Sequence, residues 1–155
     1  MNRASAFGRA VSVTLQNALS AISYDIYRDN PDKVDLDAFA PEDFRRYSLL
    51  AHIPADAHLY ASFDHLSDYS SAYYTYMWDK AIALDFFQQF NQDSLLAGDA
   101  PMRYRHQVLE PGGSVSANDL VKNFLGRPQN MAAFQRWMGE EFEPNQQTTQ
   151  QPCGR

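Results

Sequence analysis

Apolar residues recur at helical spacing near the N-terminus, and this periodicity limits the possible folds more than any other feature of the chain. Successive apolar positions are separated by four, four, four, three and four residues, at Phe7, Val11, Leu15, Leu19, Ile22 and Ile26. Such spacing places all of these side chains on one face of a helix. We therefore expect a helix that ends near Arg28, because the turn-forming residues 29–32 follow it.

Two more helices are expected in the middle of the chain. Pro41 is a favourable first residue for a helix, and the acidic residues after it suit the positive end of the helix dipole, so we expect a helix from Pro41 to about Ala51. Residues 52–64 are expected to form a loop or a short extended piece. A long helix is expected from about Tyr69 to Phe90, because apolar residues there repeat every four positions, at Trp78, Ile82, Phe86 and Phe90.

The last third of the chain predicts three further helices. The first covers residues 99–110 and ends before a Pro-Gly-Gly turn. The second is opened by Ser116 as N-cap, with Asp119 three residues later in an arrangement close to a capping box, and is closed by Gly126. The third follows over residues 127–138.

These patterns predict an all-α protein, since we find no internal repeat and no convincing pair of strands. The 155 residues fit a single domain, and a hydrophobic content of 45% is enough to form a packed core. We expect a helical part over residues 1–142. Residues 143–155 are polar and rich in glutamine, so we expect them to form a disordered tail.

Charge and cysteine content exclude several classes of function. The 13 basic and 19 acidic residues give a net charge of −6, which argues against nucleic-acid binding and against a polybasic membrane anchor. No apolar run approaches the roughly 20 residues of a membrane-spanning helix, and the N-terminus does not resemble a signal peptide. We therefore expect no nucleic-acid partner and no membrane contact. The single cysteine, Cys153, excludes an internal disulfide, a zinc finger and an iron–sulfur site.

Residues 65–76 concentrate one histidine and four tyrosines. Tyr69, Tyr73 and Tyr76 are spaced four and three residues apart, so on a helix they would share one face, with His65 just before it. Tyr74 would then lie about 100° around the helix from Tyr73, so we expect its side chain to pack against other parts of the protein. Phenol and imidazole groups aimed together can stabilise an oxyanion. Alternatively, the tyrosines form an aromatic core stripe, which the spacing alone favours because tyrosine is commonly half-buried.

Other motifs for chemistry are weak. The four histidines show neither His-Glu-x-x-His nor another ligand pair at helical spacing, so we assign no metal ligand to His52, His58, His65 or His106. No nucleophile elbow supports a Ser-His-Asp triad. Gly112 and Gly113 indicate a tight turn or a close approach of another group to the backbone.

Five blocks of sequence are specific in combination, because they occur in a defined order and spacing. They are residues 2–9 (NRASAFGR), 61–66 (ASFDHL), 69–78 (YSSAYYTYMW), 109–114 (LEPGGS) and 123–127 (NFLGR). Together, across residues 2 to about 142, they resemble the C-terminal part of the M3 zinc oligopeptidases. The resemblance implies an α-helical peptidase with a deep channel, which cleaves short peptides. It also implies a cytoplasmic location, although some relatives are exported.

The resemblance further implies roles for particular residues. In the family, zinc is held by the two histidines of His-Glu-x-x-His and a downstream glutamate, and a segment like this chain forms the opposite wall of the channel. By position, His65 and Tyr73 match the donors that stabilise the tetrahedral intermediate. Tyr69 and Tyr76 match substrate-contacting tyrosines. We also assign Gly112 and Gly113 to substrate binding.

Two departures from the family pattern leave alternatives open. The sequence contains no His-Glu-x-x-His and no later zinc glutamate. Asp64 and Asp68 occupy places where the family usually has glycine, and aspartate at a position that needs positive φ stiffens the loop and adds charge. The favoured interpretation is a C-terminal fragment of an M3 metallopeptidase. The alternatives are a non-catalytic helical module, or one half of a split peptidase completed by a chain or domain with His-Glu-x-x-His. A free-standing hydrolase that uses His65 with Asp64 or Asp68 would lack a nucleophile.

Overall fold

The computed structural model describes residues 6–28, 30–48, 52–54 and 56–140, and in these ranges the secondary structure is helical with no strand. The all-α prediction is therefore confirmed. The polar tail predicted for residues 143–155 lies outside the described residues. No helix in the described part of the chain is long and apolar enough to cross a membrane.

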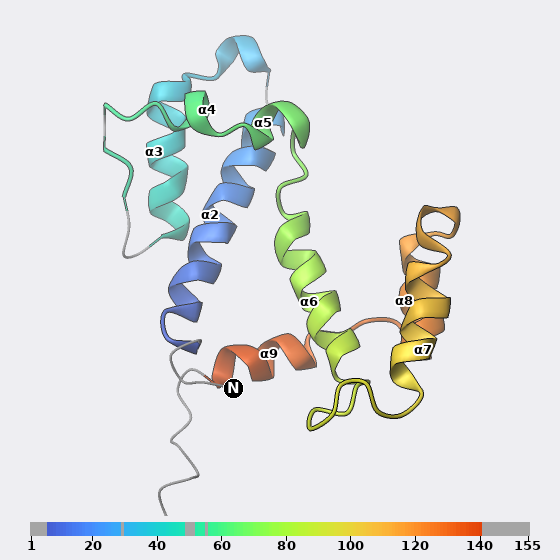
Figure 1. The fold of residues 1–155 in the computed structure, drawn as a ribbon. Coiled ribbons are helices and arrows are strands. Elements are labelled where there is room, and N and C mark those ends of the chain that lie inside the picture. Colours follow the sequence, from blue (N-terminus) through green and yellow to red (C-terminus); the bar gives the residue numbers. More distant parts are fainter. Residues whose placement is uncertain (1–5, 29, 49–51, 55, 141–155) are drawn as a thin grey trace, which may run out of the picture.

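The helices form a layered arrangement around α6 (Figure 1). α2 and α3 lie side by side, α4 and α5 cross one end of this pair, and α9 runs from the opposite end of α2 to the lower end of α6. α7 and α8 form a separate arm beyond α6. The elements are α2 (Arg9–Arg28), the 3₁₀ turn η1 (Pro31–Lys33), α3 (Leu36–Tyr47), α4 (Leu59–Ser62), α5 (His65–Asp68), α6 (Thr75–Phe87), α7 (Ala100–Tyr104), the π-helical η2 (Arg105–Leu109), the 3₁₀ turn η3 (Gly112–Ser114), α8 (Ala117–Leu125) and α9 (Ala132–Gly139).

The first helix is confirmed with its end at Arg28, but the prediction for the second helix was wrong at both ends, because α3 ends at Tyr47 and Ser48 after it is extended. α3 begins at Leu36 rather than at Pro41, which lies inside the helix. The reason is Asp35, whose side chain accepts hydrogen bonds from the backbone N–H groups of Asp37 at 3.1 Å and Ala38 at 3.3 Å. A side-chain N-cap of this kind satisfies the free donors of the first turn, so it sets the start of the helix ahead of a proline.

The long helix predicted from Tyr69 to Phe90 was wrong at both ends. The described chain forms α5, then a turn, and α6 runs only from Thr75 to Phe87. Ser70 has a φ of +50°, a left-handed conformation that a continuous right-handed helix does not accommodate. The segment predicted as a loop, residues 52–64, contains the single helical turn α4.

Capping residues determine where the helices in the last third of the chain begin and end. Ser116 Oγ accepts from the N–H of Asp119 at 3.2 Å and donates to its carboxylate at 2.7 Å, and Gly126 ends α8 with a φ of +72°. Both features were predicted. The final helix was predicted from residue 127 but begins at Ala132, and the N–H of Ala132 donates to the Asn130 side chain at 2.9 Å.

In the described ranges two hydrophobic clusters form the core, and α6 connects them. The first lies among α2, α3 and the segment that contains α4 and α5, and comprises Ala18, Ile22, Phe44, Phe63, Leu66 and Tyr73. The second lies between α6 and the α7–α8 arm and comprises Phe86, Val121 and Phe124. Because Tyr73 lies just before α6 and Phe86 lies near its end, the position of α6 fixes one cluster relative to the other.

An ion pair attaches the α8–α9 connection to α6. Asp85 is only 2% exposed, and the Arg127 guanidinium donates to both of its carboxylate oxygens, at 2.7 and 2.8 Å. The backbone N–H of Asn130 adds a third hydrogen bond at 3.1 Å. These hydrogen bonds, Arg127 foremost, hold the pKa of Asp85 below its ordinary value. Bidentate pairing of this kind fixes geometry as well as adding stability.

We expect Asp85→Asn to lower the free energy of unfolding by about 2–3 kcal/mol, because it leaves a buried hydrogen-bonding site without its charge. Urea denaturation followed by circular dichroism measures this change. Asp99→Asn is the matched control, since Asp99 pairs with Arg103 at 3.3 Å on the surface and should contribute less than about 1 kcal/mol. Equal effects of the two substitutions would contradict the role assigned to Asp85.

A buried pair of carboxyl groups lies where α2 packs against α3. Asp25 and Asp43 are both buried, Arg28 contacts Asp25 at 2.5 Å, and Arg46 contacts Asp43 at 3.4 Å. Burial, together with a hydrogen bond to Asp25, raises the pKa of Asp43 to about 6. The folded state therefore favours the protonated form of Asp43.

The stability of the protein should consequently depend on pH. The folded-state pKa of Asp43, about 6, lies above the ordinary value of 3.8, so protonated Asp43 stabilises the folded state. This contribution to the free energy of unfolding is complete below about pH 4 and is lost as the pH rises through about 6. Asp43→Asn should remove this loss, so the variant should gain on the wild type between pH 4 and 7 by up to about 3 kcal/mol. Urea denaturation at several pH values measures the difference. Parallel stability curves for the two proteins would contradict it.

Candidate functional site

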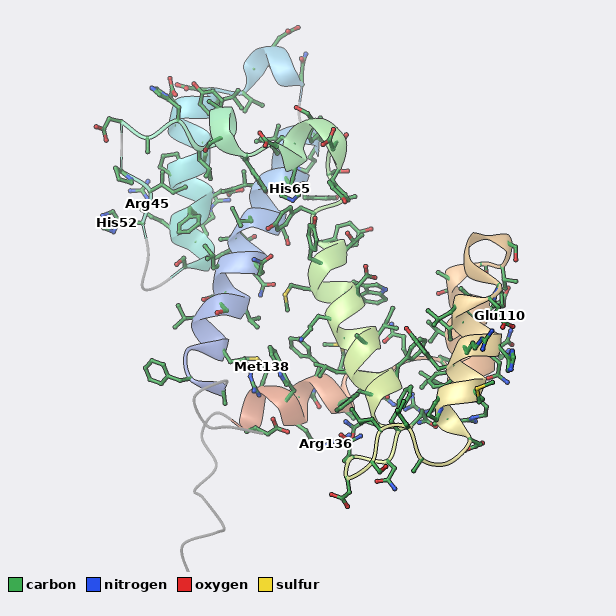
Figure 2. The ribbon with its side chains drawn as sticks, in the orientation of Figure 1. Arg45, His52, His65, Glu110, Arg136 and Met138 are labelled. Atoms are coloured by element: carbon green, nitrogen blue, oxygen red, sulfur yellow. The ribbon has the colours of Figure 1, made fainter. Side chains whose placement is uncertain are left out.

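His65 and three tyrosines come together where α5 leads into α6, and we call them the His–Tyr cluster (His65, Tyr69, Tyr73 and Tyr76). The His65 ring centroid lies 5.0 Å from that of Tyr73, and 5.6 Å from those of Tyr69 and Tyr76. His65 Nε2 lies 3.1 Å from the Tyr76 hydroxyl. Figure 2 shows His65 at the end of the molecule where α5 meets α2 and the start of α6. The four residues that the sequence grouped are therefore neighbours.

A turn, not a single helix face, brings these residues together. His65 begins α5, Tyr69 follows its last residue, Tyr73 lies in the turn, and Tyr76 lies in the first turn of α6. The left-handed residue of this turn is Ser70. Asp64 and Asp68 do not have positive φ, so the expectation that aspartate at a positive-φ position stiffens this loop does not apply to them.

Hydroxyl groups of α2 hold the turn in place. Ser23, which is fully buried, donates to the backbone carbonyl of Ser70, and Tyr27 donates to the carbonyl of Leu66. Leu66 itself belongs to the first core cluster. The backbone on both sides of Tyr69 is thus attached to a long helix, which limits the movement of the side chains between these attachment points.

The tyrosines differ in burial and in electrostatic environment. Tyr73 is only 7% exposed and packs edge-on against Phe63, whereas Tyr74 is 53% exposed, so the prediction that Tyr74 faces packing was wrong. Tyr69 and Tyr76 are exposed. A hydrogen bond with Tyr69, and then partial desolvation, raise the pKa of Tyr76 above its ordinary value of 10.0. The Tyr76 phenol therefore keeps its proton at neutral pH and can act as a hydrogen-bond donor.

The structure does not bring Gly112 and Gly113 to the His–Tyr cluster. They lie in η3 on the α7–α8 arm, and Figure 2 places the preceding Glu110 on this arm, apart from His65. Gly112 has a φ of +47°, and a Cβ atom added at either glycine would have no neighbour within 4 Å. The backbone is thus open to approach here, as the two glycines indicated, but at a separate place on the molecule.

Two of the other histidines, His58 and His106, form contacts away from the His–Tyr cluster. His58 Nδ1 lies 2.6 Å from the Asp37 carboxylate, and the Tyr60 hydroxyl donates to the same oxygen at 2.9 Å. His106 Nδ1 lies 2.7 Å from Glu110. Within residues 6–28, 30–48, 52–54 and 56–140, no group of three His, Cys, Asp or Glu side chains could hold a metal ion. These residues therefore do not fit the zinc ion that the family resemblance implies.

Sequence reasoning missed a pocket of about 420 Å³ between α6 and α7. Its walls are mainly aromatic, with one carboxylate, and consist of Asp79, Ile82, Ala83, Phe86, Phe87, Phe90 and Tyr104. The four-residue apolar repeat was the only sequence signal for it. That repeat identified Ile82, Phe86 and Phe90 as apolar positions but did not reveal that a part of this surface stays open.

We expect the chain to retain no stoichiometric zinc after incubation with the ion and gel filtration. The physical reason is that an open catalytic zinc site needs three protein ligands on neighbouring positions. Elemental analysis of the eluted protein measures the zinc content. One zinc per chain, lost on mutation of His65 or His106, would contradict this prediction.

Comparisons with known proteins identify the family. Residues 1–140 match the model of peptidase family M3. The thimet-like oligopeptidase of Dictyostelium discoideum is 34% identical over 79 residues, which are 50% of this chain and 12% of that protein. Saccharolysin of Saccharomyces cerevisiae is 39% identical over 83 residues, or 52% of this chain and 12% of its own length.

A longer match extends over most of the chain. Dipeptidyl carboxypeptidase of Escherichia coli is 29% identical over 145 residues, which are 87% of this chain and 21% of that protein. The chain thus spans between about an eighth and a fifth of the length of these relatives. With the family match over nearly all of its helical part, the chain belongs to peptidase family M3.

Proposed function

We propose that this chain supplies the substrate-binding and oxyanion-stabilising wall of a zinc-dependent M3 oligopeptidase that hydrolyses peptide bonds in short peptides. The observation that carries this proposal is the convergence of His65 with three tyrosines, in which His65 Nε2 and the Tyr76 hydroxyl lie 3.1 Å apart. Relatives of the chain are named as oligopeptidases, which supports the same activity. The cytoplasmic location implied by the resemblance is part of the proposal.

In this proposal the residues have distinct tasks. His65 and Tyr73 donate hydrogen bonds to the oxygen that becomes negatively charged when the scissile carbonyl is attacked. One such donor typically contributes about 2.7–4 kcal/mol to the transition state. Tyr69 and Tyr76 contact the substrate, and Gly112 and Gly113 let a peptide backbone approach the α7–α8 arm.

Zinc chemistry lies outside the described residues in this proposal. The metal, when bound by another chain or domain with His-Glu-x-x-His, would supply Lewis acidity and a nucleophilic water. The contribution of this chain is to bind the peptide, orient its carbonyl and provide two donors. The proposed partners are thus short peptides and that second chain or domain.

A non-catalytic helical module, or an inactive half of a split peptidase, is the second candidate. Two observations favour it: the described residues offer no metal-ligand group, and the Tyr73 ring is buried in the first core cluster. A core tyrosine stabilises the fold whether or not the protein binds a peptide. The two candidates therefore differ in what the loss of the Tyr73 hydroxyl alone should do to turnover.

Kinetics of a completed enzyme decide between them. When a chain that carries the zinc motif is supplied and cleavage of a quenched peptide appears, Tyr73→Phe should lower kcat about 100-fold or more and change KM little, because an oxyanion donor acts mainly in the transition state. His65→Ala should behave similarly. Tyr76→Phe should be milder, because its contact serves both the bound substrate and the transition state.

Tyr74→Phe is the matched control, since this neighbouring phenol is exposed and lies outside the His–Tyr cluster. It should leave both kinetic constants nearly unchanged. Equal losses for Tyr73→Phe and Tyr74→Phe, or no loss for Tyr73→Phe, would show that the tyrosines are a structural stripe. The chain by itself should not cleave the peptide.

A further inference from the structure

The aromatic pocket between α6 and α7 lies on the same face of α6 as Tyr76. Along this helix, Tyr76, Asp79, Ala83 and Phe86 follow one another at steps of three, four and three residues, which keeps them on one face. Asp79, Ala83 and Phe86 line the pocket. The pocket therefore continues the surface of the His–Tyr cluster along the helix.

The distance between the two features suits an extended peptide. A helix rises about 1.5 Å per residue, so Ala83 lies about 10 Å along the axis from Tyr76. An extended peptide advances about 3.3 Å per residue, so its side chain about three residues away from a carbonyl at the cluster would lie over the pocket. A peptide bound along this face would reach both features at once.

The chemistry of the pocket selects the kind of side chain. Phe86, Phe87 and Phe90 provide aromatic walls, and Asp79 provides a carboxylate. Asp79 is exposed and forms no ion pair with any residue in the described part of the chain. A purely apolar side chain would desolvate this carboxylate without a partner. An arginine would place its aliphatic stem and planar guanidinium against the rings and its charge beside Asp79.

We infer that this pocket is a subsite for an arginine side chain of the substrate peptide, about three residues from the scissile bond, with Asp79 as its specificity-determining residue. The inference rests on the proposed function, because only a peptide held at the His–Tyr cluster is placed along α6 in this way. The inference predicts that arginine is preferred at one position of the peptide. A general attraction by the net charge of −6 would instead favour cationic residues at any position.

Binding of two matched peptides tests the inference. The isotope-labelled full chain is titrated with an alanine–serine octapeptide that carries one arginine, and with its twin in which neutral citrulline replaces that arginine. Dissociation constants come from the NMR shifts of the α6 amides. The arginine peptide should bind about five to ten times more tightly, through one exposed ion pair and cation–π contact.

Substitutions then identify the residue responsible for the tighter binding of the arginine peptide. Asp79→Asn should bring the ratio of the two dissociation constants close to one, and Ala83→Trp, which fills the pocket, should do the same. Asp56→Asn removes an equal charge from an exposed position before α4 and should keep the ratio. Circular dichroism melting shows that each variant is folded. An unchanged ratio in Asp79→Asn, or no α6 shifts with either peptide, would overturn the inference.

A further variant separates this inference from the proposed function. His65→Ala combined with Tyr76→Phe should weaken both peptides by the same factor and leave their ratio intact, because it removes the shared contact to the peptide backbone. If this variant weakens both peptides but Asp79→Asn leaves the ratio unchanged, the proposed function stands and the arginine subsite fails. If Asp79→Asn abolishes the ratio while the cluster variant has no effect, the pocket binds arginine but peptide binding at the His–Tyr cluster is refuted.

Discussion

The ion pair between Asp85 and Arg127 determines how the two halves of the molecule are joined. It attaches the α8–α9 connection to α6, and α6 in turn contacts α2, α8 and α9. Near the far end of α9, two cations lie over the Trp137 ring. Arg9 Cζ of α2 is 4.3 Å from the ring centroid, and Lys80 Nζ of α6 is 5.1 Å from it. α9 therefore links α2 to α6, and its own position depends on the Asp85–Arg127 pair at its start.

Helices whose limits come from nearby residues could be predicted from the sequence. The spacing of apolar residues predicted α2 and its end at Arg28. Ser116 and Gly126 predicted the two ends of α8. The limits of α6 could not be predicted in this way. Its start depends on a turn whose carbonyl at Ser70 is bound by Ser23, a residue 47 positions earlier in the chain, and no local pattern reports such a contact.

The members of the His–Tyr cluster were predicted as neighbours, but their geometry was not, and Gly112 and Gly113 lie elsewhere. Spacing placed the tyrosines on one helix, whereas a turn brings them around His65 and leaves Tyr73 buried with Tyr74 exposed. Burial depends on what packs against each ring, which spacing does not contain. The NFLGR block, which contributed to the family resemblance, has a structural basis here: Phe124 is in the core, Gly126 ends α8, and Arg127 binds Asp85.

The π-helical segment η2 has an evolutionary consequence. Its bond from the N–H of Glu110 to the carbonyl of Arg105, at 2.9 Å, spans five residues instead of four, so the segment holds one residue more than an α-helix with the same hydrogen-bonded ends would need. Loss of one residue here would convert it to a regular α-helix that continues α7. Everything after that point would turn by about 100° around the helix axis, including the Gly112–Gly113 turn. Related chains that differ by one residue in this segment should therefore present that turn to a different side of the molecule.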